Sequence, residues 1–126
     1  MKVLIVIDMQ NDFTTGVLGN PQTAAVTANV VNKINEFRKS EKDGRIIATL
    51  DTHTEDYMNT QEGKNLPVPH CIRGSEGWKL VPEVEKALGK FQPGITINGK
   101  YEFKIKDQDG VEKDVKLLGN PGHLFN

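Results

Sequence analysis

Four side chains of metal-binding type lie within one polar segment of the chain. Asp51 and His53 follow directly after the apolar run RIIATL, and Glu62 and His70 come later in the same segment. Carboxylates and neutral imidazoles are the ligands that zinc, iron and manganese accept in sites rich in oxygen and nitrogen. Because residues two apart in an extended segment face the same side, Asp51 and His53 should point into one crevice. The segment predicts a divalent-metal site, and the alternative is a solvated polar loop.

Three further residues could take part in catalysis beside such a site. Asp8 ends the apolar run VLIVI, and in open α/β sheets ligands bind beyond the carboxyl ends of strands. Asp8 could therefore act as a general base, or it could cap a loop or helix. Lys100 could stabilise an oxyanion, or it could be an ordinary surface lysine. Cys71 lies beside His70 in the sequence, but sequence neighbours are seldom catalytic partners, so a small buried thiol is the favoured interpretation.

Composition limits the class of protein. The chain has 126 residues, enough for one domain with a hydrophobic core, and its formal net charge of -1 gives no hint of a nucleic-acid or acidic-lipid partner. The single cysteine excludes an internal disulfide and favours a reducing compartment. The apolar run after Met1 is too short to span a membrane, and no signal-peptide cleavage pattern follows it. We therefore expect a cytoplasmic protein with no membrane or nucleic-acid partner.

An alternation of strands and a helix should position these residues. The apolar run at 3–7 is typical of a strand buried on both faces, and 45–50 is a second such run. The polar segment at 9–20 predicts a loop, and 23–40 carries apolar residues at helical spacing. The first unit is therefore predicted to be strand, helix, parallel strand, with a right-handed crossover.

The second half of the chain changes from this alternation to a hairpin. Residues 75–88 predict a weaker helix, which Pro82 either splits or restarts, and 95–98 predict a short third strand in the same α/β sheet. The sequences YEFKIK and VEKDVKLL then alternate on either side of the turn DQDG. This pattern predicts an antiparallel hairpin over 101–118 with one polar face.

The motifs together resemble the isochorismatase-like cysteine hydrolases, and within them the nicotinamidase-related branch. The resemblance is carried by IDMQNDF, by DTH at the end of the second strand, and by EGKNLPVPHCIRGSEGW. It implies a three-layer α/β fold, in which helices cover both faces of a parallel sheet. It also implies an enzyme that cleaves a small amide such as nicotinamide. The implied cofactor is a divalent metal that binds the pyridine nitrogen: zinc first, with manganese or iron as alternatives.

The resemblance assigns roles to particular residues. Asp8 matches the aspartate that takes the proton of a catalytic cysteine, and Lys100 is the match for the catalytic lysine. Four residues match metal-ligand positions: Asp51, His53, Glu62 and His70. Cys71 matches a non-catalytic cysteine beside the metal histidine, and the nucleophile segment of the family, G-x-x-T-D-x-C-V, has no counterpart in this chain.

These departures shape the prediction for the whole chain. We expect one domain over 1–126, with an isochorismatase-like α/β part at 1–100 and a hairpin and tail at 101–126. The expected function is an amide hydrolase that is incomplete or inactive in this form, and the alternative is a non-catalytic module that binds a divalent metal or a small ligand. The later strands of the family fold are missing, so an exposed edge beside the first strand favours a homo-oligomer or covering by the hairpin.

Overall fold

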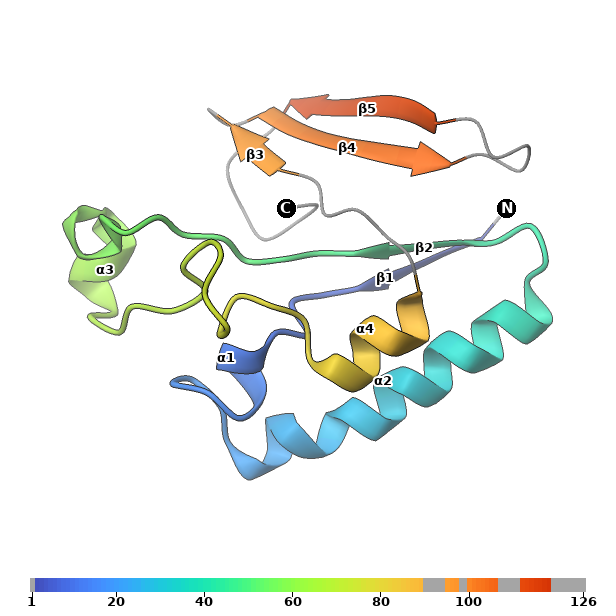
Figure 1. Cartoon of the computed structure of the whole chain (residues 1–126), viewed down its shortest axis with the longest axis horizontal. Coiled ribbons are helices and arrows are strands. Elements are labelled where there is room, and N and C mark those ends of the chain that lie inside the picture. The colour runs from blue at the N-terminus through green and yellow to red at the C-terminus, as the bar shows by residue number, and fades with distance from the viewer. Residues whose placement is uncertain (1, 90–94, 98–99, 107–111, 119–126) are drawn as a thin grey trace.

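The computed structural model describes residues 2–89 with their side chains, and the backbone of 95–97, 100–106 and 112–118. Its strands form a two-stranded parallel sheet and a three-stranded antiparallel sheet (Figure 1). Among the helices of this described part, none combines the length and the apolar character needed to cross a bilayer.

The parallel sheet is the platform for the polar segment. Strands β1 (Val3–Val6) and β2 (Arg45–Ala48) pair in register along their whole length. Helix α2 (Pro21–Ser40) connects them, so the predicted strand–helix–strand unit is confirmed. The helix begins earlier than predicted because Asn20 and Thr23 form a capping box around a proline in the first turn.

The core lies between the parallel sheet and two helices. Helix α4 (Pro82–Leu88) is shorter than the helix predicted at 75–88, because Pro82 starts it and the residues before it form turns and an isolated bridge. Figure 1 shows α2 and α4 on the same side of β1 and β2. The buried apolar residues that join these elements are Val6, Ile34, Leu50, Leu80, Val81, Val84 and Leu88.

The opposite face of the parallel sheet carries apolar side chains that remain accessible. Val3, Ile5 and Ile7 are 46%, 42% and 55% exposed. The predicted three-layer arrangement would place helices over this face as well. In residues 2–89 both long helices lie on the other face, so the part of the chain with described side chains has two layers.

Three short helices occupy segments that were expected to be loops. Helix α1 (Asn11–Thr14) lies within the predicted loop at 9–20. The 3-10 helix η1 (Tyr57–Asn59) and helix α3 (Gln61–Asn65) lie within the polar segment that carries the candidate ligands. Thr60 caps α3 by accepting a hydrogen bond from the backbone N–H of Gly63, so a short polar sequence can form a turn of helix here.

The third strand does not extend the parallel sheet. Strand β3 (Ile95–Ile97) pairs antiparallel with β4 (Lys100–Lys106), and β4 pairs antiparallel with β5 (Glu112–Leu118). The prediction that placed 95–98 beside the first two strands is therefore wrong. The connection between β3 and β4 is too short for a parallel crossover, so these two strands pair antiparallel in a sheet of their own with β5. The predicted turn DQDG and the tail lie outside the described residues.

Candidate metal centre

The polar segment folds back along itself beyond the carboxyl end of β2. The backbone N–H of His53 donates to the carbonyl of Cys71 at 2.9 Å, and the N–H of Arg73 donates to the carbonyl of His53 at 2.8 Å. These bonds pair His53 with Ile72 in a parallel bridge. His70 is thereby brought beside the residues that directly follow the strand.

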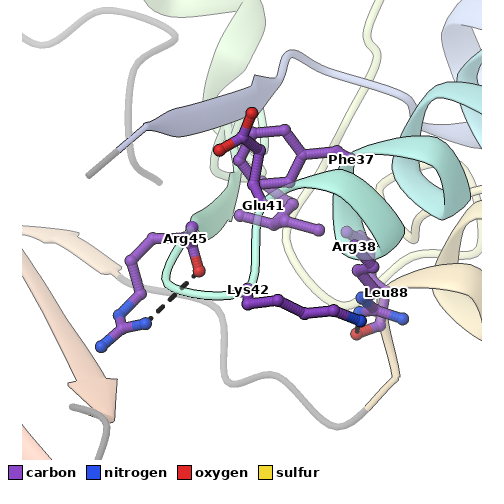
Figure 2. Close-up of a pocket in the computed structure, with 9 residues that line it drawn as sticks. Phe37, Arg38, Glu41, Lys42, Arg45 and Leu88 are labelled. Carbon is purple, nitrogen blue, oxygen red and sulfur yellow. Dashed lines mark hydrogen bonds between the residues drawn. The ribbon is translucent and has the colours of Figure 1, made fainter.

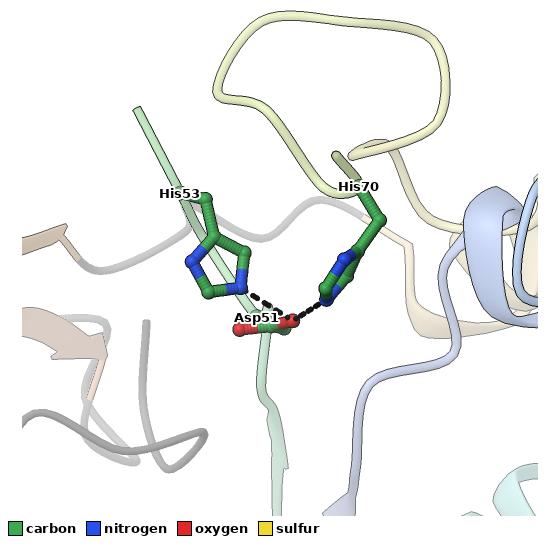
Figure 3. A group of neighbouring side chains, drawn as sticks. All are labelled: Asp51, His53 and His70. Carbon is green, nitrogen blue, oxygen red and sulfur yellow. Dashed lines mark hydrogen bonds and ion pairs between the residues drawn. The ribbon is translucent and has the colours of Figure 1, made fainter. Parts of the chain in front are cut away.

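Two imidazoles converge on one carboxylate oxygen. Oδ2 of Asp51 lies 3.1 Å from Nε2 of His53 and 3.2 Å from Nε2 of His70 (Figure 3). The candidate ligand atoms of the three residues all lie within 4.8 Å of one another. Asp51 and His70 are each only 3% exposed. The structure therefore brings together three of the four residues that the sequence predicted as ligands.

The hydrogen bond behind His70 fixes which ring nitrogen faces the cluster. Nδ1 of His70 lies 2.8 Å from the carbonyl oxygen of Val68. Because a carbonyl can only accept, Nδ1 must carry a proton, and a neutral His70 then turns an unprotonated Nε2 towards Asp51. A lone pair and a carboxylate oxygen at this distance repel each other unless a cation or a proton lies between them. The donor set and this outer hydrogen bond fit a divalent metal.

Aromatic rings hold the two imidazoles in place. The ring of Tyr57 packs edge-on against His53, with centroids 4.9 Å apart, and against His70 at 5.1 Å. Phe13 also packs edge-on against His70, with centroids 5.6 Å apart. The Tyr57 hydroxyl donates to the carbonyl of Leu66 at 2.8 Å, and burial raises the pKa of this phenol, with the charges of Glu62 and Asp51 adding to the effect. The ligand rings therefore have little rotational freedom.

Glu62 lies beside the cluster rather than within its closest group. Its Oε1 is 3.8 Å from Nε2 of His53 and 3.9 Å from Nε2 of His70. Its side chain is 45% exposed and starts from the first turn of α3. The hydrogen bond with Asp51 is the main cause of a raised His53 pKa, burial opposes it, and the charges of Asp51 and Glu62 add to the increase. Negative charge thus surrounds the imidazoles.

Asp8 lies at the same end of the sheet as Asp51. Its backbone N–H donates to Oγ1 of Thr49 at 2.9 Å, and its Oδ1 accepts from the same hydroxyl at 2.7 Å. Asp8 has a φ of 50°, a left-handed conformation that aspartate tolerates better than most residues. Thr49, which directly follows β2, therefore orients Asp8 at the carboxyl edge of the sheet, where α/β sheets bind ligands.

Cys71, one of the two other residues considered for catalysis, is not among the clustered ligands. Cys71 is fully buried, and burial raises the pKa of its thiol, helped by the negative charges of Asp51 and Asp12. It is therefore a protonated thiol inside the protein, as the favoured interpretation of the sequence proposed. Lys100 is the first residue of β4, and the position of its side chain lies outside the described residues. Its catalytic role stays a prediction.

Sequence reasoning assigned no role to two residues that contact the ligand segments. Gln10 hydrogen-bonds the backbone of Asp51, and the carboxylate of Asp12 accepts from the backbone N–H of Cys71. Both lie in the run IDMQNDF, whose residue types suggest only a polar loop. The run contributed to the family resemblance, but the partners lie far away in the sequence, so the run did not indicate these contacts.

A depression at the other end of β2 is separate from this centre. It has a volume of about 460 Å³, and Figure 2 shows its walls. The guanidinium of Arg38 donates to the carbonyls of Ala87 and Leu88 at the end of α4, so this cation already serves a structural role. The lining residues are Phe37, Arg38, Glu41, Lys42, Gly44, Arg45, Ile46, Ala48 and Leu88. They lie along β2, the turn before it and the ends of α2 and α4, whereas the candidate ligands follow the carboxyl end of β2.

The chain is similar in sequence to known proteins. The model of the isochorismatase domain family matches residues 2–105. A nicotinamidase/pyrazinamidase of Mycobacterium tuberculosis is 25% identical over 126 residues, which cover 95% of this chain and 63% of that protein. The chain therefore spans less than two thirds of this curated relative.

Two solved structures are also similar. The pyrazinamidase of Pyrococcus horikoshii in complex with zinc matches with a TM-score of 0.52 and 31% identity, over 64% of this chain and 44% of that one. The N-carbamoylsarcosine amidase from Thermoplasma acidophilum matches with a TM-score of 0.49 and 26% identity, over 67% of this chain and 46% of that one. The first of these two proteins was solved with zinc bound.

Proposed function

We propose, because the chain belongs to the isochorismatase domain family, that it binds a divalent metal and is the metal-holding part of an amide hydrolase. The observation that carries this proposal is the convergence of two histidine Nε2 atoms on Oδ2 of Asp51. Zinc is the favoured metal over manganese or iron, since the similar pyrazinamidase structure is in complex with zinc. Two imidazoles and a carboxylate also form a ligand set that zinc commonly accepts.

Each residue of the centre has a distinct part in this proposal. Asp51, His53 and His70 would hold the metal, and Glu62 would approach it from the solvent side as a fourth ligand. A bound zinc ion would act as a Lewis acid towards a lone pair of the substrate, such as a ring nitrogen. The packed rings of Tyr57 and Phe13 keep the imidazoles oriented, and they would shield the protein-facing side of the metal from water.

The proposed substrate is a small aromatic amide of the nicotinamide type. The relatives whose names describe an activity towards such amides are the nicotinamidase/pyrazinamidase and the pyrazinamidase. In hydrolysis of this amide, Asp8 would accept the proton of an attacking thiol, which a second chain would have to supply, and Lys100 would stabilise negative charge on the amide oxygen. Both roles come from the family resemblance, and the position of Asp8 at the carboxyl edge of the sheet supports the first.

One observation favours a second, non-catalytic function. A cysteine hydrolase needs an accessible thiolate, and Cys71 is the only cysteine of this chain. This thiol is buried and its pKa is raised, so it is a poor nucleophile. The chain would then bind a metal or a small ligand without cleaving an amide by itself.

Two measurements on the purified chain test these alternatives. Zinc binding would be followed by calorimetry, with His70→Ala as the control that removes a ligand. Ammonia release from nicotinamide and pyrazinamide would be measured with zinc present, with Asp8→Ala as the catalytic control. Release that disappears in Asp8→Ala supports the hydrolase, whereas zinc binding without release supports the binding module. A folded chain that binds neither zinc, manganese nor iron and releases no ammonia would refute the metal centre in both proposals.

A further inference from the structure

We propose that Gln10 and Asp12 are positioning residues for the metal centre. Their side chains fix the backbone of the two segments that carry the ligands, from a short segment that follows β1. This inference rests on the proposed function, because it presupposes that Asp51, His53 and His70 hold a metal. It adds residues that themselves offer no ligand to the cluster.

The side chain of Gln10 takes the place of a neighbouring strand at Asp51. Its Oε1 accepts from the backbone N–H of Asp51 at 2.8 Å, and its Nε2 donates to the Asp51 carbonyl at 2.9 Å. Nε2 also donates to the carbonyl of Trp78 at 2.8 Å, and the residue is 0% exposed. The ladder between β1 and β2 ends at the pair Val6 and Ala48, so strand pairing no longer holds Asp51. The buried amide supplies both of the hydrogen bonds that a strand would have made.

Asp12 fixes the peptide that joins His70 to Cys71. Oδ2 of Asp12 accepts from the N–H of this peptide at 2.8 Å. Cys71 has a φ of 48°, a left-handed conformation that is uncommon for a residue other than glycine. A hydrogen bond from an amide to a charged carboxylate is stronger than one between neutral groups, and here it supports an unfavourable backbone conformation. The direction in which the His70 side chain leaves the backbone depends on this conformation.

Asp12 is itself held tightly. Its backbone N–H donates to the carbonyl of Gly77 at 3.0 Å, while a Cβ added at Gly77 would lie only 2.1 Å from Oδ2 of Asp12. Only glycine therefore leaves room for the carboxylate at this position. Because His53 donates its N–H to the carbonyl of Cys71, the bond from Asp12 steadies the His53 segment as well.

The consequence is that one short segment determines the relative positions of all three ligands. Gln10 fixes the backbone position of Asp51. Asp12 fixes that of His70 and, through the carbonyl of Cys71, that of His53. In other metalloproteins, removing a group that orients a metal ligand by a hydrogen bond typically weakens metal affinity by roughly 10- to 100-fold. We expect an effect of about this size from each of the two residues.

The test compares zinc affinities of matched variants by calorimetry. Gln10→Met removes all three hydrogen bonds of the amide at similar volume, and Asp12→Ala removes the carboxylate. Both should bind zinc about 10- to 100-fold more weakly than the wild type. Asp12→Asn keeps an acceptor oxygen and should restore most of the affinity. Thr14→Val is the control, because this buried hydroxyl bonds only carbonyls around α1 and no ligand segment, so its zinc affinity should match the wild type.

A second readout separates positioning from a loss of stability. The visible spectrum of the protein loaded with Co²⁺ reports the geometry of the ligands, and it should change in Gln10→Met and Asp12→Ala but not in Thr14→Val. Wild-type affinity and an unchanged spectrum in folded Gln10→Met would overturn the inference. Should that variant not fold, equal affinities of Asp12→Ala and Asp12→Asn would overturn it instead. A wild-type chain that does not bind zinc would overturn the proposed function and this inference together.

Discussion

Replacing Gly77 with alanine should disturb the metal centre without changing any residue near a ligand in sequence. The added Cβ would lie 2.1 Å from Oδ2 of Asp12 and 2.2 Å from its Cγ and Oδ1, whereas ordinary contact begins at 3.4 Å. The carboxylate would have to move by more than an ångström. The backbone cannot separate easily, because the Asp12 N–H is bonded to the Gly77 carbonyl. The side chain must therefore rotate and give up its bond to Cys71.

The size of the effect follows from the bond that is lost. A hydrogen bond to a charged group contributes about 1.5–3 kcal/mol, and the N–H of Cys71 belongs to a residue that is fully buried. We expect Gly77→Ala to lower the free energy of unfolding by about 2 kcal/mol. For a domain of this size, that is a fall of roughly 8 °C in Tm. Thermal unfolding would measure this loss, and calorimetry should show zinc affinity weakened as in Asp12→Ala.

Two controls show whether the clash with Asp12 is the cause. Gly74 has a φ of 83° and nothing within 4 Å of an added Cβ, so Gly74→Ala tests backbone strain alone. It should cost about 1 kcal/mol and leave zinc affinity unchanged. In the Asp12→Ala background, Gly77→Ala should lose most of its effect, since the carboxylate is gone. An equal loss of stability in both backgrounds would refute this reasoning.

Three further predictions use the same protein. Zinc at 100 times its dissociation constant should stabilise the fold by about 2.7 kcal/mol, seen as a rise in Tm that His53→Ala abolishes; an equal rise in that variant would contradict the site. Cys71 should react with a thiol reagent only after denaturant unfolds the chain, because the thiol is buried and its pKa is raised; fast labelling of the native protein would show otherwise. Asn20→Ala removes the cap of α2 and should lower stability in urea unfolding by about 1 kcal/mol with zinc affinity unchanged, a result that altered affinity would overturn.

The first strand–helix–strand unit could be predicted because its signals are local. Apolar runs mark both strands, and helical spacing with the Asn20–Pro21 start marks α2. The sheet that β3 joins could not be predicted in the same way, because its pairing is not a local signal. A run of three residues says little about its partner, and the short connection between Ile97 and Lys100 excludes only a parallel pairing of β3 with β4.

The candidate site could be predicted in residue types but not in geometry. Asp51 and His53 follow a strand, so their neighbourhood could be anticipated from the sequence. The approach of His70 depends on the backbone pairing between His53 and Cys71, which the length of the intervening segment does not determine. Glu62 was predicted with the same reasoning, and its Oε1 lies 3.8 Å from Nε2 of His53 and 3.9 Å from Nε2 of His70, so its role as a ligand stays a prediction.

The residues that support the ligands were the hardest to foresee, and the reason is physical. A glutamine in a polar run has the composition of a solvated loop, and only burial makes its amide valuable as a partner for backbone. Gln10 meets Asp51 across 41 positions of sequence, and Asp12 meets Cys71 across 59. Such contacts exist only after the chain has folded. The types of the ligands therefore indicate which metal the centre could hold, while the residues proposed to set its geometry, Gln10 and Asp12, are identified only by contacts that the fold creates.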